Sequence, residues 1–440
     1  MIAAVQNWQT MSPAERNKVL ERPAMSRNPI IAAQASEIIS EVRRNGDRAL
    51  IEYTQRFDRC KPESLRVSED EFLLAEEILP ITIKQAVDVA IRNVRAVHLA
   101  QIPAEIAVDV QAGVRCERHN RPIDAVGLYV PSGSAPLPST AIMLGVPASV
   151  AGCSTRIMCT PASEDGKVNP ATLYAARQSG VTEVFRIGGA QAIAAMAFGT
   201  ETVPRVNKIF GPGNAWVTAA KSIVANDYAG AAIDMPAGPS EVMVIADASA
   251  NPSFAAADLL AQAEHGDDSQ VLLLTDSEHL AHAVVQEIEM QLCKLTRNHT
   301  IRQALGHSHI LTVANMTEAV EVCNAYAPEH LILLVDEPRS LLAKVSNAGA
   351  VFIGPYSPES AGDYCSGANH VLPTYGAAKY LSGLGVEQFM RQISVQELSR
   401  DGLAALAPTI DALALAEGLD AHAAAVRVRL EGTACKEALT

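Results

Sequence analysis

The sequence predicts an α/β protein with two incomplete Rossmann-like domains, one interrupted by the other, and with small helical segments at the N- and C-terminal ends. A chain of 440 residues is too long for a single compact core. Short apolar segments typical of strands alternate twice along the chain with longer segments of helical periodicity. A stretch rich in Gly and Pro, residues 229–240, separates these two arrays, and we expect the chain to cross between domains there.

The first array covers residues 124–211. Its strand candidates, such as AVGLYV and RIMCT, alternate with helical segments such as STAIMLGVPASVAG. This alternation favours βαβ units and a mainly parallel sheet. The second array, residues 241–353, repeats the pattern with EVMVIAD, QVLLLT, HILTVA, HLILLV and AVFIG as strands. The similar size of the arrays suggests duplicated α/β domains, although no internal repeat is strong enough to prove duplication.

The segments outside the arrays complete the expected organisation. Apolar positions at helical spacing precede the first array, with one alternating, strand-like segment at 108–118, and the tail from Ser394 onward is again typical of helices. Residues 354–385 form a long stretch dense in Gly, Ser, Tyr and Pro, which is usually functional in a compact protein. We therefore expect an N-terminal helical segment at 1–24, one α/β domain made of 25–128 and 240–382, a second α/β domain at 129–239, and a helical C-terminal segment at 383–440.

Composition excludes several classes of function. The chain carries 35 basic and 49 acidic residues, a net charge of −14, which argues against a nucleic-acid partner. Although 48% of the residues are hydrophobic, no uncharged apolar run reaches the length of about 18 residues expected of a membrane span. The start of the chain lacks the pattern of a signal peptide, and the eight cysteines include no CxxC pair. We expect a soluble, cytoplasmic protein with reduced cysteines.

The segment AQAEHGDDSQ at 261–270 ends an apolar helix that should begin at Asn251 and Pro252. In such a helix Gln262 and His265 project from one face at i, i+3 spacing, close enough to hold one metal ion or one substrate. The alternative is a solvated polar patch in which His265 complements the helix dipole, and this segment alone favours that alternative.

Three other segments place polar side chains at the ends of expected elements. These segments hold Glu329 and His330 in NAYAPEHLIL, Asp363 and His370 in ESAGDYCSGANH, and Glu417 and His422 in AEGLDAHAAAV. Taken alone, Glu329 and His330 could equally be a helix-capping glutamate and a core histidine. The closely spaced histidines at 279 and 282, and at 307 and 309, lack a persuasive carboxylate cluster nearby, so we expect structural roles for them.

The segments YVPSGSAPLPST, GGAQAIAAMAFGT, FGPGNAWV, DMPAGPSEV, AQAEHGDDSQ, APEHL, GDYCSGANHVLPT and AEGLDAHAAAV occur in this order, and together they resemble the histidinol dehydrogenase family over nearly the whole chain. The resemblance implies an aldehyde-dehydrogenase-like sandwich architecture. It also implies a zinc- and NAD-dependent enzyme that oxidises L-histidinol through the aldehyde to L-histidine, the last steps of histidine biosynthesis.

The resemblance also implies a set of site residues. It assigns the zinc ion to Gln262, His265, Asp363 and His422, a donor set that suits a borderline cation. It assigns acid/base chemistry to Glu329 and His330, with His330 as the base that takes the hydroxyl proton and Glu329 activating water for the second oxidation. The residues implied to contact substrate are Ser240, Gln262, His265, His330, Asp363, His370, Glu417 and His422.

For NAD, the family resemblance points to Tyr129, Gln191 and Asn214. The sequence contains neither a G-x-G-x-x-G motif after a strand nor a GxxxxGK[ST] motif, so the usual phosphate cradles are absent. Glycines in GLYVPSGSAP, RIGGAQ and FGPGNAW follow strand ends instead, where they permit close approach of the backbone to phosphate. Turn formation alone is the alternative explanation for these glycines.

The resemblance implies a homodimer, in which the C-terminal arm 383–440 reaches the partner's active site and the zinc site is shared. Two alternatives remain at this point. One is a paralogue of the same fold that oxidises another amino or hydroxy alcohol, against which the retention of Ser240, His370 and Glu417 argues. The other is a catalytically silent metal-binding protein, against which the presence of Glu329 and His330 argues.

Overall fold

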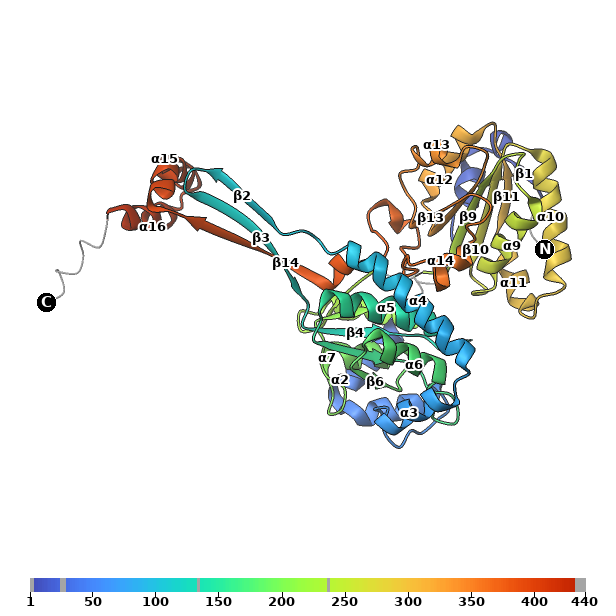
Figure 1. Cartoon of the computed structure of the whole chain (residues 1–440), viewed down its shortest axis with the longest axis horizontal. Coiled ribbons are helices and arrows are strands. Elements are labelled where there is room, and N and C mark those ends of the chain that lie inside the picture. Colours follow the sequence, from blue (N-terminus) through green and yellow to red (C-terminus); the bar gives the residue numbers. More distant parts are fainter. Residues whose placement is uncertain (1–3, 24–28, 133–134, 236–237, 432–440) are drawn as a thin grey trace. The chain divides into compact units, whose positions relative to one another are not determined.

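The computed structural model describes residues 4–23, 29–132, 135–235 and 238–431. Two compact units make up the chain, one of Met1–Gln101 with Ile123–Phe389 and one of Ile102–Pro122 with Met390–Thr440 (Figure 1). The larger unit holds two parallel sheets, each covered by helices, and the smaller unit holds an antiparallel sheet. Among the described residues, no helix has both the length and the apolar run needed to cross a bilayer.

The larger of the two parallel sheets has the strand order β1-β11-β10-β9-β12-β13. Alternate residues of its central strand face two separate cores: Val242 and Val244 pack against α9, α10 and α11, whereas Met243 and Ile245 pack against the N-terminal segment and α12. The strands are Gln6–Asn7 (β1), Glu241–Ala246 (β9), Gln270–Thr275 (β10), His309–Thr312 (β11), His330–Leu334 (β12) and Ala350–Ile353 (β13). The helices are Pro13–Val19 (α1), Pro252–Ala263 (α9), Glu278–Leu292 (α10), Asn298–Leu305 (α11), Met316–Tyr326 (α12), Pro338–Leu342 (α13) and Glu359–Tyr364 (α14).

The second parallel sheet has the strand order β6-β5-β4-β7-β8. Its strands are Ala125–Tyr129 (β4), Thr155–Cys159 (β5), Glu183–Phe185 (β6), Lys208–Phe210 (β7) and Ala232–Ile233 (β8). The helices between them are Pro138–Ala151 (α5), Pro170–Ser179 (α6), Gly189–Phe198 (α7) and Ala215–Asn226 (α8). Three further helices precede the sheet in sequence: Pro29–Phe57 (α2, kinked at Gly46), Glu69–Ile78 (α3) and Ile81–Ala100 (α4).

These three early helices differ in position from our expectation. We expected 25–128 to belong with 240–382, but α2 packs on α7 and α8, and α3 and α4 pack on α5 and α6. Apolar residues of α2, such as Ile38 and Leu50, share one core with Phe185 and Ile193. The amphipathic pattern predicts that each of these helices buries its apolar face, but it does not indicate which of the two sheets that face packs against.

The smaller unit is built from a three-stranded antiparallel sheet and a helical pair. Its strands are Ile106–Gln111 (β2), Val114–Pro122 (β3) and Met390–Leu398 (β14), in the order β14-β3-β2. Helices Arg400–Glu417 (α15) and Asp420–Glu431 (α16) follow. The expected helical tail from Ser394 is therefore wrong in its first residues, because these pair with β3 over a full ladder from Met390↔Pro122 to Leu398↔Val114.

The N-terminal segment also contains more than the helix that we expected. A capping box begins α1, since Ser12 and Glu15 hydrogen-bond reciprocally there. Before it, however, Gln6 and Asn7 add a parallel edge strand to β11. Three short 3₁₀ helices, Trp8–Thr10, Ala377–Lys379 and Val386–Phe389, complete the described elements.

Candidate active site

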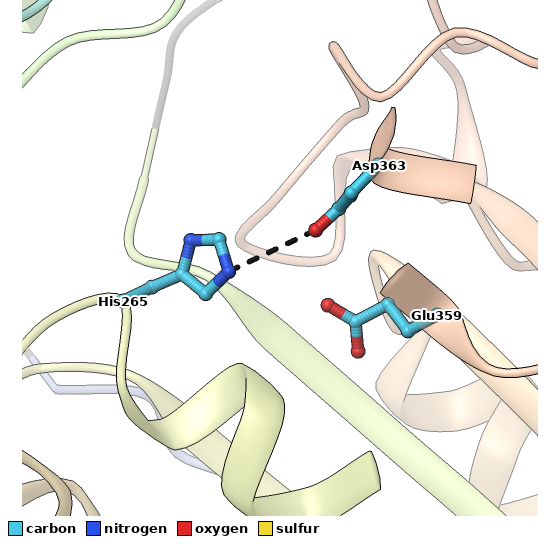
Figure 2. Close-up of side chains that lie close together, drawn as sticks. All are labelled: His265, Glu359 and Asp363. Carbon is cyan, nitrogen blue, oxygen red and sulfur yellow. Dashed lines mark ion pairs between the residues drawn. The ribbon is translucent and has the colours of Figure 1, made fainter. Parts of the chain in front are cut away.

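Three side chains from two elements of the larger unit form a cluster of metal-type ligands. The carboxylates of Glu359 and Asp363 stand one turn apart on α14, so both face the loop after α9, which carries His265 (Figure 2). Nε2 of His265 lies 3.8 Å from Oδ2 of Asp363. One ligand atom from each of the three residues lies within 4.8 Å of the others. Imidazole nitrogen and carboxylate oxygens are the donors that Zn²⁺ accepts in proteins, so the cluster fits a zinc ion.

The loop after α9 brings His265 to this cluster by a route that the sequence did not predict. The helix begins at Pro252 with Asn251 as N-cap, as expected, but it ends at Ala263. His265 lies beyond the helix, and its N–H donates to the carbonyl of Gln262 at 3.2 Å in a tight turn. The prediction that Gln262 and His265 share one helical face is therefore wrong in detail, because the helix ends at Ala263, before His265.

Gln262 lies next to the cluster but is held by two other groups. It is buried, with 1% of its surface exposed. When its side-chain Nε2 donates to the Glu359 carboxylate, at 2.7 Å from Oε2, its Oε1 accepts the N–H of Glu241 at 3.2 Å. In this arrangement the Gln262 amide links Glu359 of the cluster to the backbone of Glu241.

Glu359 is a member of the site that the sequence analysis missed. It is 1% exposed, and its Oε1 lies 3.9 Å from Nδ1 of His330, so this member of the ligand cluster also lies close to the acid/base pair. The available signal was its position four residues before Asp363 in a short helix after Pro358. Two carboxylates one turn apart are common on solvent-exposed helices. Only its burial, which the sequence does not reveal, distinguishes this glutamate from an ordinary surface residue.

The structure brings Glu329 and His330 together through the backbone of Glu241. The N–H of Glu241 donates to Oε2 of Glu329 at 2.9 Å, and Nδ1–H of His330 donates to the carbonyl of Glu241 at 3.1 Å. This second bond fixes the proton on Nδ1, so Nε2 is the basic nitrogen. Nε2 faces the ligand cluster, at 3.9 Å from Oδ1 of Asp363.

A turn just before Glu329 lets these two adjacent side chains serve one site. In a continuous strand they would point to opposite faces of the sheet. Instead, Ala327 ends α12 in the left-handed region with φ 57°, and β12 begins only at His330. The left-handed residue Ala327 therefore breaks the alternation before the strand begins.

Burial moves the pKa values of the pair in opposite directions. Loss of solvent lowers the pKa of His330 to about 3, so the imidazole is neutral and its Nε2 carries no proton. The same loss of solvent raises the pKa of Glu329 well above its usual range. It also raises the pKa of Glu359 and Asp363, and lowers that of His265. A neutral base beside carboxyl groups of raised pKa is an arrangement suited to proton transfer.

The remaining predicted substrate residues fall into two groups. His370 lies beside the cluster, because its Nδ1–H donates to the carbonyl of Asp363 at 2.9 Å and its Nε2 lies 3.4 Å from Oγ1 of Thr140. Burial lowers the pKa of His370 to about 4. Ser240 immediately precedes Glu241 at the start of β9 and is half-buried. Glu417 and His422 are exposed and belong to the smaller unit, at the end of α15 and on α16.

The predicted NAD residues lie at the carboxyl edge of the other sheet. Tyr129 ends β4, Gln191 lies in the first turn of α7, and Asn214 caps α8 by accepting the N–H groups of Trp216 and Val217. Strand order reverses between β4 and β7, so Tyr129 and Asn214 flank the switch point where open α/β sheets bind nucleotides. Oε1 of Gln191 is buried and has no hydrogen-bond partner among the described residues, which leaves an acceptor for a ligand.

A fully buried ion pair shapes the loop between β7 and Asn214. Lys221 donates to the carbonyl of Gly211 at 2.9 Å and pairs with Asp234, whose Oδ2 accepts the N–H of Gly211 at 2.8 Å. Gly211 has φ 120°, and a Cβ atom there would lie 2.2 Å from the carbonyl oxygen of Tyr129. Only glycine permits this approach of the two strand ends. Residues 133–134 of the first glycine-containing motif lie outside the described residues.

A neutral buried base beside a ligand cluster, in a unit whose second sheet offers a nucleotide-type edge, is an arrangement consistent with a nucleotide-dependent dehydrogenase. A family model described as histidinol dehydrogenase matches residues 20–430. The histidinol dehydrogenase of Photobacterium profundum is 51% identical over 424 residues, covering 96% of this chain and 95% of that protein. That of Vibrio cholerae is 52% identical over 424 residues, covering 96% and 97%. The chain belongs to the histidinol dehydrogenase family.

Structural comparison agrees with this assignment. The crystal structure of histidinol dehydrogenase from Elizabethkingia anophelis matches with a TM-score of 0.93 and 43% identity over 98% of both chains. The predicted α/β fold is confirmed by this match. The family is zinc- and NAD-dependent, and the cluster of His265, Glu359 and Asp363 supplies donors of the right kind for zinc. The expected aldehyde-dehydrogenase-like sandwich arrangement stays a prediction.

Proposed function

We propose that this chain oxidises L-histidinol through L-histidinaldehyde to L-histidine with NAD⁺ as oxidant, in the cytoplasm, at the end of histidine biosynthesis. One observation carries the proposal: the basic Nε2 of His330 faces Asp363 of the ligand cluster, at 3.9 Å. A substrate held at the cluster would therefore present its hydroxyl group to a neutral imidazole. Family membership narrows the alcohol to histidinol.

The chain's own residues account for the proton transfers of both oxidations. In the first, Nε2 of His330 takes the hydroxyl proton as the alcohol becomes an aldehyde. In the second, Glu329 takes a proton from the water that adds to the aldehyde. Because burial raises the pKa of Glu329, its carboxylate is a stronger base than an exposed one once it is ionised. NAD⁺ would be held near Tyr129, Gln191 and Asn214, where it would supply the oxidant that receives a hydride from the reacting carbon in each oxidation.

Substrate binding is proposed to use residues from both units. Zinc, held by His265 and Asp363 with Gln262 and His422, would bind the imidazole and amino nitrogens of histidinol. Ser240 and His370 would hydrogen-bond polar atoms near the reacting carbon. The carboxylate of Glu417 would pair with the substrate's ammonium group.

Chelation tests the proposed function directly. We expect purified protein to reduce NAD⁺ with L-histidinol, to lose this activity after treatment with a strong chelator, and to regain it when Zn²⁺ is added. NADH formation at 340 nm and metal analysis of the same sample are the measurements. Active protein that contains no divalent ion would contradict the zinc assignment. Faster oxidation of another amino or hydroxy alcohol in a substrate panel would contradict the substrate assignment.

We further propose that the protein is a homodimer with shared sites. The proposed ligands and substrate contacts divide between the units, since Gln262, His265 and Asp363 lie in the larger unit, whereas Glu417 and His422 lie in the smaller one. Both of the latter are exposed. Exchange of the C-terminal arm between two copies would complete each site with residues of the partner.

Mixed dimers test this sharing. Co-expressed His265→Ala and His422→Ala chains, each inactive alone, should form dimers in which one site carries both defects and the other carries none. With random pairing, activity should recover to roughly a quarter of wild type, because about half of the dimers are mixed and each has one intact site. Differently tagged chains allow the mixed dimer to be isolated. An isolated mixed dimer without activity would show that each chain completes its own site.

A further inference from the structure

A buried ion pair between Arg22 and Glu241 adjoins the proposed acid/base pair, because the backbone of Glu241 hydrogen-bonds both Glu329 and His330. Nε of Arg22 donates to Oε1 of Glu241 at 2.5 Å, and Nη2 of Arg22 donates to Oε2 at 2.9 Å. The side chain of Glu241 is fully buried and that of Arg22 is 12% exposed. A bidentate pair of this kind fixes both the distance and the plane of the two groups.

Arg22 also holds the turn that delivers the acid/base pair. Its Nη2 donates to the carbonyl of Tyr326 at 2.8 Å and to that of Ala327 at 3.3 Å. Its guanidinium lies over the Tyr326 ring, 3.8 Å from the centroid. Ala327 is the residue with φ 57° that directs the chain into Glu329 and His330. One side chain from the N-terminal segment therefore stabilises the unusual end of α12.

Glu241 connects this arginine to the reacting groups. Its backbone N–H and carbonyl hydrogen-bond Glu329 and His330, while its carboxylate receives Arg22. The N–H of Tyr375 donates to the same carboxylate at 2.8 Å, and the Tyr375 hydroxyl donates to the carbonyl of Pro23 at 3.0 Å. A shift of Glu241 would therefore move both Glu329 and His330.

We propose that Arg22 is a positioning residue for the oxidation: it acts through Glu241 and through the turn at 326–327 to hold Glu329 and His330. The kinetic part of this inference rests on the proposed function. Arginine is required because one planar guanidinium serves the carboxylate, the carbonyls and the aromatic ring together, which a lysine ammonium cannot do.

The test compares Arg22→Met with Arg16→Met. Arg16 is a matched control. Like Arg22 it lies in the N-terminal segment, contacts an aromatic ring, with its guanidinium 4.9 Å from the Trp8 ring centroid, and donates to a backbone carbonyl, that of Trp8, at 3.1 Å. These contacts are within the N-terminal segment and do not involve Glu241 or the turn at 326–327. We expect Arg22→Met to lower kcat for histidinol by roughly 10–100-fold, the usual effect of a small misplacement of reacting groups. The KM for histidinol should change by less than about threefold, since the interaction does not touch substrate. Arg16→Met should leave both constants near wild type.

A double-variant cycle shows whether Arg22 acts through Glu241. The loss of kcat in Arg22→Met and in Glu241→Gln should not add in the double variant. The double variant also leaves no unpaired buried carboxylate, so it folds more readily than Arg22→Met alone. If Arg22→Met does not fold, Arg22→Lys and the double variant are compared with Arg16→Met, and a loss of kcat at unchanged KM in both supports the proposal.

Chemical labelling gives a readout that does not depend on activity. Diethyl pyrocarbonate should modify His330 faster in the Arg22 variants than in Arg16→Met, with His309 of the same sheet as internal reference in peptide mapping. Labelling and kcat both equal to those of Arg16→Met would overturn the proposal, as would additive effects in the cycle. Wild-type protein that does not oxidise histidinol would overturn the proposed function instead, and the labelling result would still decide the role of Arg22.

Discussion

Replacement of His330 by asparagine is expected to lower the rate of the first oxidation by roughly 10²–10⁴-fold, the usual contribution of a positioned base. The structural reason is that Nδ1–H of His330 is already committed to the carbonyl of Glu241, which leaves Nε2 as the proton acceptor. Asparagine can keep that hydrogen bond to Glu241 but has no basic nitrogen. Stopped-flow measurement of NADH formation from histidinol in a single turnover isolates this step.

His309→Asn is the matched control for this substitution. His309 lies in β11 of the same sheet, and its Nδ1 lies 3.1 Å from Oε1 of Gln6, so it is a hydrogen-bonded histidine outside the site. Its replacement should leave the single-turnover rate within about twofold of wild type. A comparable loss of rate in both variants would mean that His330 supports the sheet rather than the proton transfer.

Replacement of Glu329 by glutamine should slow mainly the second oxidation, from aldehyde to acid, by about 10²-fold. Glutamine keeps the buried shape and can still accept the N–H of Glu241, which Glu329 accepts at 2.9 Å, but it cannot take a proton from water. Alcohol oxidation should fall by less than about tenfold, because His330 remains in place. Single-turnover rates with histidinol and with histidinaldehyde provide the comparison.

The exposed Glu337, in the loop after β12, supplies the control variant Glu337→Gln, which should oxidise both substrates at wild-type rates. The assignment of water activation to Glu329 would be abandoned if Glu329→Gln oxidised alcohol and aldehyde at equal, unimpaired rates. A loss of equal size in both steps would indicate instead that Glu329 orients His330. Oε2 of Glu329 lies 3.6 Å from Nδ1 of His330.

The sequence was sufficient to predict elements whose pattern is local. The alternation of strands and helices predicts both parallel sheets, and Asn251 marks a helix start that the structure confirms. Pairing between distant segments was not predictable. The alternation in RQISVQEL is too short to identify Met390–Leu398 as a strand, and nothing local indicates that its partner is Val114–Pro122.

The site shows the same division between local and distant information. His265, Asp363, Glu329 and His330 were predicted from motifs, and the structure brings them close together in the larger unit. Glu359 and Arg22 were missed, because their importance comes from burial and from partners far away in sequence: Glu359 meets Gln262, and Arg22 meets Glu241 across 219 positions. Periodicity and spacing carry no information on such contacts.

The buried Lys221–Asp234 pair makes the loop between β7 and Asn214 insensitive to ionic strength. Mobile ions screen charges over a Debye length of about 8 Å at physiological ionic strength, but they act only where solvent can enter. Both members of this pair are fully buried, whereas the Arg43–Asp227 pair elsewhere in the unit is partly exposed. A higher salt concentration therefore weakens ion pairs at the surface but not the Lys221–Asp234 pair that hydrogen-bonds Gly211. The conformation of the loop between β7 and Asn214 should consequently not depend on ionic strength.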